Sequence, residues 1–221
     1  MNDNLASLGY RMPAEWEKQS STWLAWPHNK NDWPDKFENI PSTFAKITSA
    51  LSKVQNVDIL IQSKIVKKNI KKILIKEQTN LNRVNFHIIK TNRVWTRDTG
   101  PIFLVNDLLK KKIMTNFHFN AWAKYKDYNF DNAIKPQIAK IKNIELIDVK
   151  AKIKNKIKDV ILEGGAIDVN GKGTLIATKE CLLSKVQERN PGLSRKKLEI
   201  ILSESLNIKN FIWLNKGIVG D

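Results

Sequence analysis

The chain is organised around the stretch Arg93-Val94-Trp95-Thr96-Arg97-Asp98-Thr99-Gly100-Pro101. Four apolar residues, 102–105, follow it directly. Because Gly-Pro is strong punctuation, the pattern predicts a strand, a tight bend and then a second strand. A bend of this kind holds a carboxylate at the end of a strand, where it faces a cleft rather than open solvent.

Two side chains of this stretch suit a flat cation. The ring of Trp95 offers cation–π attraction, and the carboxylate of Asp98 offers paired hydrogen bonds. A structural explanation stays open at this point: Asp98 pairs with Arg97 or Arg93, and Trp95 fills the core.

Composition narrows the class of protein. The 221 residues suffice for one large or two small domains, and 42% of them are hydrophobic. There is no apolar run long enough to cross a membrane, and the N-terminal residues lack the layout of a secretory signal. The single Cys excludes an intrachain disulfide framework. These features together predict a cytoplasmic protein.

The net charge of +16 comes from 38 Lys and Arg against 22 Asp and Glu. Strong basicity is often a sign of nucleic-acid binding. Here the excess is nearly all Lys, is scattered, and is not interleaved with aromatic residues as in a strand-binding groove. We therefore do not expect a nucleic-acid partner.

Strands and helices alternate along the chain, which predicts an α/β fold with weak internal repetition. An Asn-Gly turn at residues 170–173 predicts a hairpin, and Ser194 is a good helix N-cap. Expected strands cover residues 21–26, 57–61, 84–88, 102–105, 112–120, 145–149, 160–162, 166–169, 174–178 and 211–214, and expected helices cover residues 42–54, 66–77, 132–142 and 194–202.

Leu162-Glu163-Gly164-Gly165 is a second candidate site. The glycines permit a bend and the close approach of a partner or ligand, and they hold Glu163 at the end of an apolar segment. A carboxylate in such a place orients a His or binds a cation. An ordinary β-bulge with Glu163 paired to one of the many Lys explains the pattern equally well.

The remaining reactive residue types give weaker patterns. Trp122 and Tyr125 either wall a pocket or simply cover a loop. Two Leu follow Cys181 and no His lies near it in sequence, which favours a buried, unreactive thiol. The three His show no metal-ligand spacing: His28, His87 and His118.

Taken together, the motifs resemble agmatine deiminase, more closely than they resemble the related bacterial peptidyl-arginine deiminases. They occur in the family's order along the whole chain. The matching stretches are Met12–Glu17, Thr22–His28, Arg93–Pro101, Leu162–Leu175, Glu180–Leu183 and Trp213–Asp221.

The resemblance implies a pseudo-fivefold α/β propeller of ββαβ modules. It also implies hydrolysis of the small guanidino substrate agmatine to N-carbamoylputrescine and ammonia, on the way to putrescine, with no cofactor and no metal. By the same resemblance, Asp98 and Asp221 bind the guanidinium group and Trp95 lines its pocket. Glu163 orients the His that acts as general acid and base.

The chain departs from the family pattern at its end. The family's His-x-Asp stretch and its nucleophilic Cys lie beyond Asp221, and Cys181 matches a structural Cys instead. We therefore expect residues 1–221 to form one incomplete domain with about three of the five modules, inactive alone. A homo-oligomer of the full-length enzyme stays open. Two rival functions remain: a protein-arginine deiminase, and a non-catalytic basic binding module on the same fold.

Overall fold

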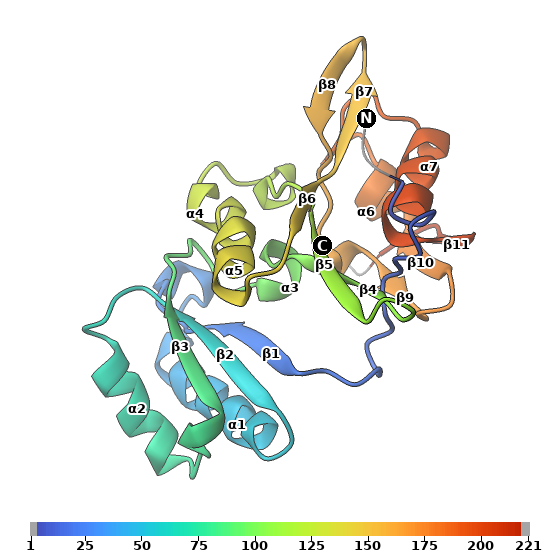
Figure 1. Ribbon diagram of the computed structural model, residues 1–221. Coiled ribbons are helices and arrows are strands. Elements are labelled where there is room, and N and C mark those ends of the chain that lie inside the picture. The colour runs from blue at the N-terminus through green and yellow to red at the C-terminus, as the bar shows by residue number, and fades with distance from the viewer. Residues whose placement is uncertain (1–3, 218–221) are drawn as a thin grey trace. The chain divides into compact units, whose positions relative to one another are not determined.

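The computed structural model describes residues 4–217, which divide into two compact units (Figure 1). The first comprises the residues up to Glu17, Arg97–Tyr128 and the residues from Lys135 onward; we call it the acidic-site unit. The second comprises Lys18–Thr96 and Asn129–Ile134; we call it the parallel-sheet unit.

The parallel-sheet unit is a βαβαβ arrangement. Its three strands are β1 (Ser21–Ala25), β2 (Asn56–Ile61) and β3 (Val84–Ile88), all parallel and in that spatial order. Helix α1 (Ile40–Ser52) connects the first pair and α2 (Lys67–Lys76) the second. Parallel neighbours require such crossovers, which Figure 1 shows in blue to green.

The core of this unit follows from the alternation of side chains along β2. Val57, Ile59 and Ile61 share one face of the strand and pack against the buried Ile70 and Leu74 of α2. The other face of β2 is buried as well, so residues 57–61 form a continuous apolar run apart from Asp58.

The acidic-site unit contains the same pattern twice: an antiparallel hairpin, a helix and a third strand parallel to the second. The first copy is β4 (Ile102–Asn106), β5 (Lys111–Asn116), α5 (Ile134–Lys142) and β6 (Leu146–Asp148). In Figure 1 these strands run from green to yellow. Such a repeat is a ββαβ unit.

The second copy begins with β9 (Asp168–Val169) and β10 (Thr174–Thr178). Helices α6 (Lys179–Leu183) and α7 (Arg195–Leu206) lead to β11 (Asn210–Leu214), which pairs with β10 in parallel. The Asn-Gly turn and the Ser194 N-cap lie where the sequence predicts them.

One hairpin has no counterpart in the sequence-based expectations. Strands β7 (Lys150–Ile153) and β8 (Lys156–Asp159) join through Lys154 and Asn155, both at positive φ. The expected strand at residues 160–162 is wrong in its extent, because Ile161 forms only a single bridge to His118. The other short helical segments are η1 (Lys30–Asp32), η2 (Phe37–Asn39), η3 (Leu81–Arg83), α3 (Thr96–Thr99), η4 (Ala121–Ala123), α4 (Asn129–Asn132) and η5 (Gly164–Ala166).

The predicted α/β class is confirmed, whereas the propeller and its number of modules stay predictions. No helix between residues 4 and 217 has the length and hydrophobicity that a membrane crossing requires. Within the same residues, no group of three or more His, Cys, Asp or Glu side chains is arranged to hold a metal ion.

Candidate active site

Asp98 lies on α3, a single helical turn that ends at the Gly-Pro pair. The expected strand before it is therefore wrong, although the strand after it is present as β4. The backbone N–H groups of residues 92 and 93 both donate to Asp131, over 2.7 and 3.2 Å, instead of to a neighbouring strand. A side chain thus replaces the sheet partner that the strand would need.

The turn that carries Asp98 packs against the glycine pair of the second motif. The Gly165 N–H donates to Oδ1 of Asp98 over 3.2 Å, across 67 positions of sequence. A Cβ at Gly165 would lie 2.1 Å from that oxygen, and one at Gly164 would lie 2.6 Å from the backbone oxygen of Arg97. Only glycine permits this approach, so the two candidate motifs are in direct contact.

Trp122 completes the contacts of Asp98. Its indole N–H donates to the carboxylate, and its ring meets Phe119 edge to face at 5.1 Å. The residue stands on η4, where Ala121, Trp122 and Ala123 all have φ between 52° and 58°. Three consecutive non-glycine residues in the left-handed region are strained, and such strain is often retained at functional sites.

The environment of Asp98 disfavours its charge. Burial, followed by the negative charge of Glu163, raises the pKa of Asp98 to about 6, against an ordinary value of 3.8. The two N–H donors and Arg97 oppose this rise only in part. A bound cation would stabilise the ionised form of such an acid and would lower its pKa.

Arg97 is not the ion-pair partner of Asp98 that the structural explanation of this stretch would require. That guanidinium is paired with Glu15, with a distance of 2.7 Å between Nη2 and Oε2 and a second contact from Nη1 to Oε1. The pair also lowers the pKa of Glu15, chiefly through the hydrogen bonds from Arg97. Within residues 4–217, no Lys, Arg or His forms a salt bridge with Asp98.

Glu163 is the most buried carboxylate of the candidate site, with 1% of its side chain exposed. Nε of Arg189 donates to Oε1 over 3.0 Å. Within the described part of the chain, no donor reaches Oε2. The expected alternative, a pair with Lys, is thus replaced by a buried pair with Arg.

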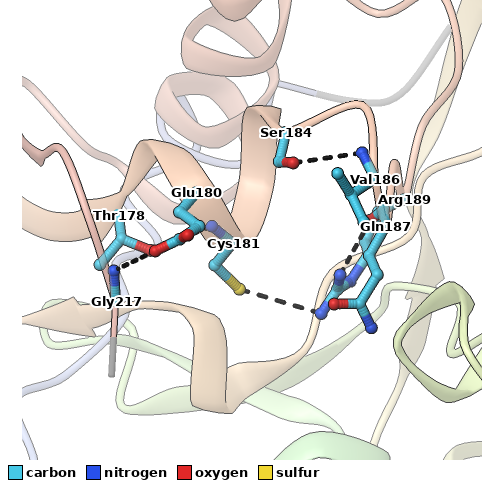
Figure 2. Close-up of a pocket in the computed structure, with 8 residues that line it drawn as sticks. All are labelled: Thr178, Glu180, Cys181, Ser184, Val186, Gln187, Arg189 and Gly217. Carbon is cyan, nitrogen blue, oxygen red and sulfur yellow. Dashed lines mark hydrogen bonds between the residues drawn. The ribbon is translucent and has the colours of Figure 1, made fainter. Parts of the chain in front are cut away.

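Two cavities adjoin this network. One, of about 150 Å³, is shown in Figure 2 and lies between α6 and the loop that carries Arg189. The other, of about 220 Å³ and more open to solvent, reaches Gly165. The residues that line the first are Thr178, Glu180, Cys181, Ser184, Val186, Gln187, Arg189 and Gly217.

Comparison with known proteins decides the family. The sequence model of the Porphyromonas-type peptidyl-arginine deiminases matches residues 11–221. The chain belongs to this family. The resemblance seen in the sequence is thereby confirmed at family level.

Relatives named agmatine deiminase resemble the chain over its whole length. That of Pseudomonas syringae pv. tomato is 28% identical over 100% of this chain and 57% of its own length. That of Ectopseudomonas mendocina is 32% identical over 96% of this chain and 55% of its own length. The chain therefore spans a little over half the length of these relatives.

Solved structures of agmatine deiminases share the fold. That of Enterococcus faecalis has a TM-score of 0.82 at 27% identity, over 98% of this chain and 56% of its own. A C. jejuni agmatine deiminase with substrate bound has a TM-score of 0.77 at 28% identity, over 95% of this chain and 57% of its own.

The family resemblance implies two further site residues, Trp95 and Asp221. Trp95 belongs to the parallel-sheet unit, where it is 41% exposed and its ring lies 5.7 Å from that of Trp33. Asp221 lies outside the described residues. The roles of both stay predictions, as do the roles of Asp98 and Glu163.

Cys181 is less buried than the sequence suggests. It is half-buried on α6, lines both cavities and lies 3.9 Å from Nη2 of Arg189, measured at Sγ. Sequence reasoning also missed Arg189 itself. The Lys and Arg are so numerous that no sequence pattern singles out Arg189, which is 5% exposed in the structure.

Proposed function

We propose that the chain supplies guanidinium-binding residues of an agmatine deiminase, the enzyme that hydrolyses agmatine to N-carbamoylputrescine and ammonia. The observation that carries the proposal is the meeting of Asp98 and the Glu163–Gly165 turn within one compact unit. The names of the relatives support the choice of substrate.

The chemistry explains why two carboxylates are needed. The carbon of a guanidinium group is a poor electrophile because its charge is delocalised over three nitrogens. Carboxylates must therefore clamp the planar cation and fix the carbon for attack by a thiolate. Asp98 is the clamp. By the family resemblance, Asp221 is a second guanidinium-binding carboxylate and Trp95 is a further substrate-binding residue. Glu163 orients the His that protonates the leaving ammonia and then activates water.

The reacting thiolate and the His come, by the family resemblance, from outside residues 1–221. Cys181 is not the nucleophile. We propose that the 221-residue chain binds a guanidinium weakly and does not turn agmatine over by itself.

Agmatine binding tests the proposal and has a defined pH dependence. Because the pKa of Asp98 is raised to about 6, the carboxylate is largely protonated at pH 5 and ionised at pH 7. Agmatine affinity should therefore rise between pH 5 and pH 7, whereas Asp98→Asn should bind at least about tenfold more weakly at pH 7 and lose this rise. NMR titration of the 221-residue chain, with the Trp122 indole N–H as reporter, measures both.

The control is Asp35→Asn, the same chemical change at an exposed Asp of the parallel-sheet unit. It should bind as the wild type does. Equal affinity in Asp98→Asn and wild type would contradict the proposed role. Tighter binding of a blocked arginine amide than of agmatine would favour a protein-arginine deiminase. Salt-sensitive retention on heparin without guanidinium binding would favour the basic binding module.

A further inference from the structure

The segment that ends in Glu163 is held on one side by a single β-bridge to His118 and on the other side by a loop. Oδ1 of Asn190 accepts from the Ile161 N–H over 2.9 Å, and Nδ2 of Asn190 donates to the Ile161 carbonyl over 2.8 Å. One side-chain amide therefore satisfies both backbone groups of Ile161, as a neighbouring strand would. The chain leading to Glu163 is fixed from the loop that also carries Arg189.

Arg189 uses each of its nitrogens on a different partner. Nε donates to Oε1 of Glu163 over 3.0 Å and Nη1 donates to the Gln187 carbonyl over 2.8 Å. Nη2 lies 3.9 Å from Sγ of Cys181, the contact drawn at the centre of Figure 2. The guanidinium is locked from three sides and cannot rotate without losing these bonds.

This geometry differs from that of a self-contained ion pair. An Arg whose only task is to neutralise a buried carboxylate usually engages both of its oxygens in a fork. Here Arg189 holds one oxygen from the side, and Oε2 is buried without a donor among residues 4–217. A buried acceptor without a donor destabilises the fold, so its retention indicates that a donor is supplied by a bound group.

We propose that Arg189 is a positioning residue for Glu163: it fixes Oε1 and thereby keeps Oε2 as an open acceptor for an N–H of a delocalised cation. In the whole enzyme that donor is the imidazolium of the acid–base His. Residues 1–221 do not supply this His, so in the 221-residue chain the guanidinium of agmatine takes its place. The inference rests on the proposed function for the identity of the cation. The orientation of Glu163 by Arg189 is independent of it.

A double-mutant cycle on agmatine affinity tests the proposal in the 221-residue chain. Arg189→Met should weaken binding about tenfold in the wild-type background, but less than about twofold when Glu163→Gln is already present. Arg189→Lys, which keeps the charge without the planar fork, should fall between wild type and Arg189→Met. The control Arg195→Met removes a half-exposed Arg of the same unit and should change nothing.

A purely structural Arg189 would weaken binding by the same factor in both backgrounds, and that result would overturn the proposal. If Arg189→Met does not fold, Arg189→Lys carries the same cycle. If the wild type binds no agmatine, the proposed function fails, and the pKa of Asp98 measured by NMR becomes the readout. Arg189→Met should then change that pKa in the wild-type background but not in Glu163→Gln, and equal changes in both would overturn the proposal.

Discussion

Gly165→Ala is expected to lower the free energy of unfolding by about 2 to 4 kcal/mol and to displace the carboxylate of Asp98. The added Cβ would lie 2.1 Å from Oδ1 of Asp98 and 3.3 Å from Cγ of Arg97. Since the backbone of Gly165 is not in the left-handed region, the loss would come from this contact and not from backbone strain. Urea unfolding with a tryptophan signal measures the change.

A second substitution isolates the cause. In an Asp98→Ala background the offending oxygen is absent, so adding Gly165→Ala should cost less than about 1 kcal/mol. An undiminished cost in that background would show that the glycine is needed for another reason. The contact between the two motifs would then not explain the glycine pair.

Asp98→Asn is expected to stabilise the protein at pH 8 by about 1 to 2 kcal/mol, the full effect of the shift being reduced by partial solvent exposure. The folded-state pKa of Asp98, about 6, lies above its ordinary 3.8. The contribution of Asp98 to stability is therefore fully present below pH 3.8 and is lost as the pH rises through 6. The Asn variant avoids this loss, because it has no charge to bury.

The difference between variant and wild type should shrink toward zero as the pH falls to 4. Unfolding by urea at pH 4, 6 and 8 measures it, and Asp35→Asn serves as the exposed control. A stabilisation of the same size at every pH, or a variant less stable than wild type at pH 8, would contradict the burial of charge at Asp98. Lower stability at neutral pH in exchange for a binding group is common at functional sites.

The sequence pattern correctly predicted the strands and helix ends that depend on interactions between neighbouring residues. The β-branched run at Val57–Ile61 is a strand, and Ser194 caps α7, because neighbouring residues decide both. The strand predicted before Asp98 is absent because of a contact between residues that are distant in sequence. Asp131, distant in sequence, takes the backbone N–H groups that a strand would have used.

The candidate site was visible in part. Asp98 and Glu163 stand out because Gly-Pro or Gly-Gly follows closely after each of them, and because their sequence context carries the family resemblance. The contacts by which Arg189 holds Glu163 and Asn190 holds Ile161 could not be predicted from the sequence, since they depend on the path of the loop between α6 and α7. The left-handed turn at Trp122 was likewise not predictable from the sequence, because it contains no glycine.

An NMR titration of the Asp98 carboxyl carbon shows whether Asp98 and Glu163 share one site. The pKa of Asp98 should be about 6 in the wild type. This pKa should fall toward the ordinary value when Glu163 is changed to Gln, and should also fall when agmatine is added to the wild type. A pKa of Asp98 that neither change moves would show that the two carboxylates act apart.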